Sequence, residues 1–255
     1  MWEALAILLA GVAAGTINTV VGSGTLVTFP TLLALGFAPI TANVSNNVGL
    51  VFGALSGAWG YRHELGGTRP LLVRLAPASV VGGVAGAVLL LRLPPRAFVA
   101  VVPVLIALAL VLVVAQPRIA AATAARRERA GAAHPGAGPL AQSGTLLAGV
   151  YGGYFGAAQG VLMVGLLGTL LDETLQRING IKNVLVAIVN GVATATFLII
   201  APGSVDWAAA GLIAVGAIGG GFVGARVGRR LPSSVLRGVI VVVGAVAIVR
   251  LVWPS

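Results

Sequence analysis

The stretch that decides the fold is Asn18-Thr19-Val20-Val21-Gly22-Ser23-Gly24-Thr25, which interrupts a long apolar run near the start of the chain. Residues 4–61 around it contain no charged side chain, and a membrane-crossing helix needs about 20 mostly apolar residues. Irregular backbone at membrane depth is tolerated only where it is buried in protein or lines a cavity. We therefore expect this break to lie inside a membrane protein, with helix-end N–H groups free to bind an anion. A simple kink is the alternative that the sequence leaves open.

The composition of the whole chain supports a membrane protein. Of its 255 residues, 58% are hydrophobic and 9% are charged, and the mean hydropathy is +1.04. A soluble domain carries about 25% charged residues, so these values exclude a cytosolic enzyme, a nucleic-acid binder and a disordered protein. The absence of cysteine excludes a disulfide scaffold and a thiolate metal site. The net charge of +10 comes mostly from arginines in short tracts between apolar runs, as in membrane-surface anchors.

Eight hydrophobic segments predict an all-α integral membrane protein, since an open sheet cannot leave its edges in lipid. They cover residues 4–35 (interrupted), 40–61, 71–91, 96–115, 142–170 (interrupted), 176–201, 207–226 and 234–253. A basic stretch at 116–141 predicts a connecting loop between an N-terminal repeat at 1–115 and a C-terminal repeat at 142–255. The start Met1-Trp2-Glu3 has no basic region, so we expect no cleaved signal peptide.

The two halves echo each other at a shift of 138 residues. The run Gly82-Gly83-Val84-Ala85-Gly86-Ala87 recurs as Gly220-Gly221-Phe222-Val223-Gly224-Ala225, and Gly22 falls on Gly160. With a two-residue gap, the spacing Asn43-x-x-x-Asn47 recurs as Asn179-x-x-x-Asn183. Internal repeats are typical of transporters, with the substrate site at the repeat interface. The repeated glycines also predict close packing of helix backbones.

The arginines favour one topology. If all eight segments cross the membrane, eight arginines lie on one side and seven on the other. If the two interrupted segments are re-entrant hairpins, the division becomes twelve and three, a bias that the positive-inside rule expects. Three full crossings per half would then invert the second repeat relative to the first. We expect a bacterial inner-membrane protein with a cytoplasmic central loop and both termini in the periplasm.

Polar residues also lie within two of the apolar segments. Asn43, Asn46 and Asn47 share one helical face, as do Asn179, Lys182 and Asn183. Polar residues at such depth usually face the protein interior and mark a functional site. Lys182 is the only lysine, and the six acidic residues all lie near segment ends or in loops, so we expect a bound anion to neutralise it. The alternatives are that the ammonium reaches the surface or pairs with Glu173 or Asp172.

An enzyme is not expected. Neither histidine, His63 nor His134, is placed by the sequence near Ser23, and hydrolysis would need a nucleophile with a base. The chain has no metal-ligand cluster and no cofactor motif. No acidic residue lies in the middle of a segment, so a carboxylate proton relay and an acidic sodium site are not visible either.

The motif at residues 11–30, GVAAGTINTVVGSGTLVTFP, resembles the opening motif of the sulfite exporter TauE/SafE family. The later stretches ANVSNN at 42–47 and GAWGYR at 57–62 strengthen the resemblance. It implies export of small sulfur-containing anions, such as sulfite, sulfoacetate or other organosulfonates, across the bacterial inner membrane. The resemblance carries over the family's glycine-and-hydroxyl loop to Gly22, Ser23, Gly24 and Thr25, and its Asn-rich second helix to Asn43, Asn46 and Asn47. The second half departs from it with Ala157-Ala158-Gln159, which puts a symmetric binding loop in doubt.

Together these features predict a secondary transporter that binds a small anion at the repeat interface. The predicted substrate-binding residues are Asn18, Ser23, Gly24, Thr25, Asn43, Asn46, Asn47, Gln159, Gly160, Asn179, Lys182 and Asn183. An anion channel and a membrane scaffold without transport activity are the alternatives. The expected partners are the anion and the lipid bilayer; a homodimer is left open, and no nucleic acid, metal or cofactor is expected.

Overall fold

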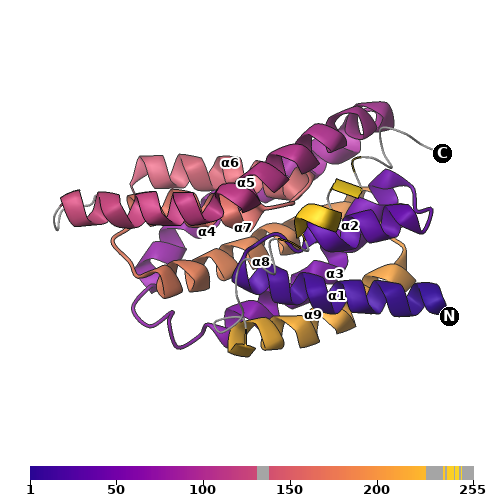
Figure 1. The fold of residues 1–255 in the computed structure, drawn as a ribbon. Coiled ribbons are helices and arrows are strands. Elements are labelled where there is room, and N and C mark those ends of the chain that lie inside the picture. Colours follow the sequence, from indigo (N-terminus) through magenta and orange to yellow (C-terminus); the bar gives the residue numbers. More distant parts are fainter. Residues whose placement is uncertain (131–137, 228–237, 239, 244, 247, 249–255) are drawn as a thin grey trace.

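The computed structural model describes residues 1–130, 138–227, 238, 240–243, 245–246 and 248 (Figure 1). All regular secondary structure within these residues is helical, which confirms the predicted all-α class. The elements are α1 (Trp2–Val20), α2 (Thr25–Ala34), α3 (Pro39–Gly60), α4 (Arg69–Arg92), α5 (Pro95–Ala130), α6 (Pro139–Tyr154), α7 (Gln159–Leu170), α8 (Leu175–Ile200), the 3₁₀ turn η1 (Pro202–Ser204) and α9 (Trp207–Val227). Most of the predicted eighth segment, 234–253, lies outside the described residues.

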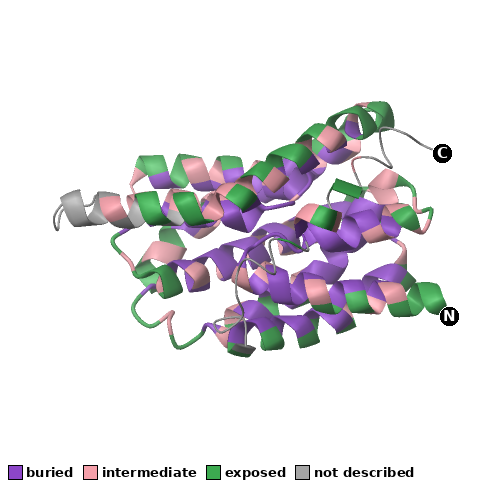
Figure 2. Ribbon diagram, in the orientation of Figure 1, coloured by how far each residue is buried: buried purple, intermediate pink, exposed green. Residues whose placement is uncertain are grey.

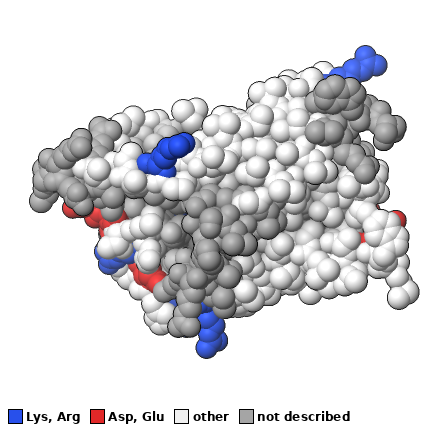
Figure 3. Space-filling model, in the orientation of Figure 1, with Lys and Arg blue, Asp and Glu red and all other residues white. Residues whose placement is uncertain are grey.

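Five helices in the described ranges are long and apolar enough to cross a membrane. They are Trp2–Val20, Arg69–Arg92, Pro95–Ile119, Leu175–Ile200 and Trp207–Arg226. Helix α3 has a similar length of 22 residues but carries three asparagines. Figure 2 shows buried residues concentrated around α2, α8 and the facing sides of α1 and α9, with exposed residues on the outer faces. Large apolar side chains such as Leu9, Val104 and Val111 are exposed there, and few charges interrupt the face drawn in Figure 3. Such a surface suits contact with lipid.

The predicted connecting loop at 116–141 is corrected by the structure. Helix α5 continues for 36 residues to Ala130, so residues 116–130 are helical, and α6 begins at Pro139. At 1.5 Å per residue such a helix is ~54 Å long, well beyond the ~30 Å hydrocarbon core. The physical reason lies in composition, because alanine and arginine, which dominate 119–130, are both strong helix formers. The charged residues within 116–141 had suggested a loop.

Both interrupted segments are broken by a turn. The first turn, residues 21–24, separates α1 from α2, and the second turn, residues 155–158, separates α6 from α7. Each contains a glycine with positive φ, Gly22 at 88° and Gly156 at 81°. Figure 1 shows α1 entering the bundle from the end marked N and α6 entering from the opposite end. The helices flanking each turn pack against each other, so each interruption forms a hairpin. The orientation of the halves in a membrane stays a prediction.

Glycines hold the two halves together. Helix α1 packs closely on α9, and α6 packs closely on α4. A side chain at Gly220 would overlap the α1 backbone at Val12, and one at Gly82 would overlap the α6 backbone at Leu146. The predicted close packing at these glycines is therefore confirmed. Because each hairpin packs on a helix of the other half, both turns are held in the middle of the bundle.

Candidate functional site

The two turns meet through their backbones. The N–H of Gly160 donates a hydrogen bond of 3.0 Å to the carbonyl oxygen of Gly22. A Cβ on either glycine would overlap the other residue, so this approach requires two residues without side chains. Ser23 and Gln159, the neighbours of these glycines in the chain, are both buried. The structure thus brings together the two stretches that the sequence predicted to share a site.

Lys182 reaches the first turn from α8. Its side chain is completely buried, and its Nζ donates to the carbonyl oxygens of Asn18 at 3.0 Å and Thr19 at 3.2 Å. These carbonyls belong to the last turn of α1, where backbone oxygens lack helical partners and carry partial negative charge. The lysine stem runs past Gly160, whose Cβ would meet Lys182 Cδ at 3.0 Å. The ammonium therefore links α8 to the first turn and borders the second.

The alternatives considered for Lys182 are both wrong. The side chain does not reach the surface, and Glu173 forms its ion pair with Arg177 instead. The expectation that only an anion could offset this charge also needs correction, because α1 carbonyls already offset part of it. An ammonium has three N–H donors, and two of them are occupied here. One donor is left for a solute.

The asparagines of α3 brace the turns. Asn46 Nδ2 donates to Thr25 Oγ1 at 3.3 Å, and its Oδ1 accepts a hydrogen bond from the Thr28 hydroxyl. Asn43 Nδ2 donates 3.0 Å to the carbonyl of Tyr154, the last residue of α6. Helix α3 is thereby tied to both hairpins.

The remaining predicted asparagines differ in the hydrogen bonds that they form. Asn47 Oδ1 accepts from Thr194 Oγ1 at 3.2 Å, which joins α3 to α8, and Asn183 Nδ2 lies 3.5 Å from the Thr19 carbonyl. Asn18 contributes its carbonyl, while its side chain is only half-buried. Asn179 is half-buried within α8, and its side chain forms no hydrogen bond with another described residue. The amides were expected to donate to an anion, but those of Asn43 and Asn183 donate to protein carbonyls.

Unpaired donors gather at the first turn. Within the described residues, no group accepts a hydrogen bond from the N–H groups of Ser23, Gly24 or Thr25, the residues that lead into α2. The buried hydroxyls of Ser23 and Thr19 also have no partner among these residues. A buried polar atom left unpaired costs about 1–3 kcal/mol, and native proteins normally satisfy such atoms with protein, water or ligand. The free donors suit the oxygen atoms of an anion.

The second turn has used part of its backbone donors. The N–H groups of Gln159 and Val161 donate to the carbonyls of Gly156 and Ala158, and that of Gly160 donates to Gly22. The N–H groups of Ala157 and Ala158 have no acceptor among the described residues, as at the first turn. Tyr151 Oη donates 2.5 Å to the Ala157 carbonyl, and Gln159 Nε2, which lies against Gly152, is a buried donor without a described partner. The N–H of Gly160, predicted to lie at the anion site, is occupied by Gly22 in this structure.

Several residues of the site escaped the sequence analysis. The Thr19 carbonyl accepts from Lys182 and the Thr28 hydroxyl donates to Asn46. Both residues lie in the quoted motif, where only the Thr28 hydroxyl was a signal for the contact that it makes. Tyr151 precedes its turn by one helical turn, and nothing in its sequence context indicates that it would clamp that turn. The turn glycine matching Gly22 in conformation is Gly156, four residues before the Gly160 that sequence comparison paired with it.

Aromatic rings cover one flank of the turns. Phe29 of α2, Phe98 of α5 and the α6 end residues Tyr154 and Phe155 pack edge to face, with ring centroids 5.3–6.4 Å apart. All four side chains are buried. Edge-to-face contacts of this kind add about 0.5–1.5 kcal/mol each beyond burial. The cluster forms a barrier between the turns and that flank.

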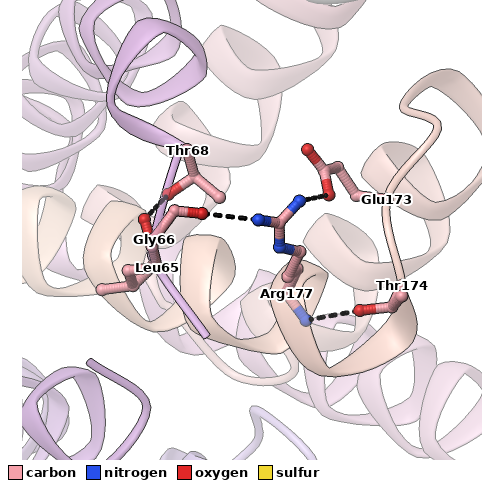
Figure 4. Close-up of polar contacts among 6 residues, drawn as sticks. All are labelled: Leu65, Gly66, Thr68, Glu173, Thr174 and Arg177. Carbon is pink, nitrogen blue, oxygen red and sulfur yellow. Dashed lines mark hydrogen bonds and ion pairs between the residues drawn. The ribbon is translucent and has the colours of Figure 1, made fainter. Parts of the chain in front are cut away.

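A group of polar contacts around Arg177, called the Arg177 clasp below, joins Glu173 and Gly66 near the start of α8 (Figure 4). Arg177 Nη1 pairs with Glu173 Oε2 at 2.8 Å, and Nη2 donates 2.5 Å to the carbonyl of Gly66. Thr174 caps the helix by accepting from the Arg177 N–H at 3.3 Å. The clasp joins the α3–α4 connection, residues 61–68, to the helix that carries Lys182 five residues further on.

Comparison with known proteins identifies this architecture. Residues 7–251 match the family described as "Sulfite exporter TauE/SafE". The "Probable membrane transporter protein YfcA" of Escherichia coli strain K12 is 27% identical over 247 residues, which cover 95% of this chain and 87% of that protein. The proteins of the same name from strains O6:H1 and O157:H7 match equally. No solved structure gives a significant match.

The family match covers nearly the whole chain, and the structure contains five apolar helices of membrane-spanning length in its described part. The protein is therefore a multi-pass membrane protein of a transporter family. It belongs to the sulfite exporter TauE/SafE family.

Proposed function

We propose that the protein is a secondary transporter that exports small sulfur-containing anions, such as sulfite or organosulfonates, across the bacterial inner membrane. One observation carries this proposal. The first turn and the first residue of α2 are buried, and the N–H groups of residues 23–25 have no acceptor among the described residues, while the buried ammonium of Lys182 binds the end of α1 that leads into this turn. Helix N-termini bind anions because their free N–H groups and the helix dipole both favour negative charge.

The first turn supplies donors of several kinds for such a solute. Anion oxygens would accept from the N–H groups of residues 23–25, from the Ser23 hydroxyl and from the third N–H of Lys182. The Gln159 amide, whose Nε2 is unpaired, adds a donor from the second hairpin. Because sulfite and sulfonate groups present only acceptor oxygens, a site made of donors suits them.

Alternating access of the solute to the two sides of the membrane would be controlled by two barriers that flank the turns. The aromatic cluster of Phe29, Phe98, Tyr154 and Phe155 would close one route to the turns, and the Arg177 clasp would close another. In transporters built of two repeats, the halves rock around a fixed central site. The arginine distribution puts residues 116–130 and the clasp on the cytoplasmic side and both termini in the periplasm.

The test is flux in proteoliposomes. Purified protein is reconstituted into vesicles loaded with sulfite, and uptake of labelled sulfite or methanesulfonate is followed with and without the internal anion. Saturable uptake that is accelerated by internal anion supports the proposal. Unsaturable conductance would instead indicate a channel, and absence of any anion flux would favour a scaffold; either result contradicts the proposal.

Matched variants connect flux to the first turn. Ser23→Ala removes a buried hydroxyl at the turn, whereas Ser143→Ala removes an exposed hydroxyl that bonds only within α6. We expect the first change to raise the apparent KM and the second to leave flux unchanged. Equal kinetics in both variants would remove Ser23 from the site.

A further inference from the structure

The charge balance around the first turn restricts the solutes that it can hold. Lys182 is the only charged side chain among the buried residues that the structure describes. Of the described acids, Glu3 and Asp172 are exposed, and Glu64, Glu173 and Asp206 are half-buried near helix ends or in connections. The arginines whose burial the structure describes are exposed, except for the half-buried Arg177. Among the side chains with described burial, one positive charge therefore stands alone in the interior.

The helix ends change this balance little. The C-terminus of α1 and the N-terminus of α2 meet at the same turn, and helix ends carry roughly half a charge of opposite sign. The α1 carbonyls that bind Lys182 offset about as much charge as the free N–H groups of α2 add. The sum at the turn stays close to a single positive charge.

We infer that the first turn takes solutes with one negative charge, among them hydrogen sulfite and monovalent sulfonates, and rejects dianions such as sulfate, sulfoacetate and fully deprotonated sulfite. The inference rests on the proposed function and names its substrate class more narrowly. A monoanion brings the buried charge to zero, whereas a dianion leaves one negative charge without a partner. An unpaired buried charge is strongly unfavourable, because neither water nor an opposite charge replaces its lost hydration.

Three probes that share a sulfur centre with at least two oxygens separate charge from shape. Methanesulfonate carries one negative charge, sulfate carries two, and dimethyl sulfone carries none. Binding is measured by isothermal titration calorimetry and by thermal stabilisation of the full-length protein in a non-ionic detergent. We expect methanesulfonate to bind more tightly than sulfate by on the order of 100-fold or more, since each tenfold step needs only a modest energy difference.

Removing the ammonium reverses the preference. In Lys182→Gln, the charge at the turn falls to zero, so dimethyl sulfone should bind at least as well as methanesulfonate. Ser23→Ala serves as the matched variant, because it removes a donor while keeping the ammonium. It should weaken all three probes and preserve the order of methanesulfonate over sulfate, and it remains informative if Lys182→Gln does not fold.

The outcomes distinguish the inference from the function beneath it. Sulfate binding as tightly as methanesulfonate would overturn the single-charge rule while leaving anion transport intact. Binding of none of the probes, together with no sulfite flux, would overturn the proposed function and the inference with it. An unchanged charge preference in a folded Lys182→Gln protein would also overturn the inference, because the ammonium would then not set it.

Discussion

The first turn reads Val21-Gly22-Ser23-Gly24 and the second reads Phe155-Gly156-Ala157-Ala158. Both place a glycine of positive φ two residues after a helix ends and three residues before the next begins. At the following two positions the first turn has a serine and a glycine, and the second has two alanines. The backbone plan is shared, and both turns have N–H groups without an acceptor among the described residues, but only the first turn adds a hydroxyl, that of Ser23.

The second turn is held closed by groups that the first turn lacks. The Tyr151 hydroxyl binds the carbonyl of Ala157, and Ala158 adopts a φ of 59°. A non-glycine residue in this conformation is uncommon and needs support from its surroundings. The difference teaches that the first hairpin adds the Ser23 hydroxyl and the contact with Lys182 to its free N–H groups, while the second hairpin is fixed by the Tyr151 side chain.

The largest expected effect is that of Lys182→Gln on the first turn. The change leaves the carbonyls of Asn18 and Thr19 without their charged donor and removes the positive charge from the site. We expect sulfite flux and anion-dependent thermal stabilisation to be lost, and stability to fall by about 1.5–3 kcal/mol for the charge-assisted hydrogen bonds. Flux in proteoliposomes and unfolding in detergent measure the two effects. Unaltered stabilisation by sulfite in this variant would reject the role of Lys182.

Alanine at the two turn glycines sharpens the comparison. Both glycines have positive φ, which costs a residue with a side chain about 1–2 kcal/mol. Gly22→Ala also forces a methyl group into the backbone of Gly160, whereas Gly156→Ala meets the Gly152 carbonyl at 3.0 Å and then only Thr25 at 3.9 Å. We expect Gly22→Ala to lose about 1–3 kcal/mol more than Gly156→Ala. Equal losses in thermal unfolding would mean that the turns do not touch.

Ser23→Ala probes binding rather than stability. The serine hydroxyl is buried without a described partner, so its removal should leave the melting temperature unchanged or raise it slightly. Affinity for methanesulfonate should fall by roughly tenfold, the loss of one good hydrogen bond. A variant that loses stability and keeps affinity would show that the hydroxyl serves the fold.

Tyr151→Phe tests the opposite behaviour at the second turn. The hydroxyl makes one hydrogen bond to the Ala157 carbonyl, so its loss should cost about 1 kcal/mol of stability. Because this turn is assigned a supporting role, the affinity for methanesulfonate should change by less than about threefold, which corresponds to a small change in binding free energy. Calorimetry measures the affinity for methanesulfonate in this variant and in Ser23→Ala. A larger loss of affinity in Tyr151→Phe than in Ser23→Ala would contradict the roles assigned to the two turns.

The smallest expected effect is at the clasp. Glu173→Gln removes an ion pair whose side chains are 40% exposed at Arg177 and 17% exposed at Glu173. Partly exposed pairs contribute about 0–1 kcal/mol, so the melting temperature should hardly change. The hydrogen bond from Arg177 to Gly66 should survive and keep the 61–68 connection in place. A severe loss of stability would show that Glu173 orients the arginine.

Much of the fold was predictable because the strongest constraints are local. Long apolar runs fix the helices, and glycines mark both interruptions, with serine and threonine beside them only in the first. Residues 116–130 were missed because their arginines suggested a loop, although alanine and arginine both favour a helix. The charge of Lys182 marked it as a site residue, but its α1 carbonyl partners are separated from it by more than 160 residues. Partners at such distance depend on packing that no local pattern encodes.

The backbone hydrogen bond between Gly160 and Gly22 has a consequence for how the halves can move. Any rearrangement that tilts one half against the other has to pass through the point where two residues without side chains touch. A motion that keeps this contact would rotate the halves about it. The solute would then lie beside the axis of rotation and be exposed first to one compartment and then to the other. The chain would then need to shift the covering elements by many ångströms while the donors themselves stay almost still.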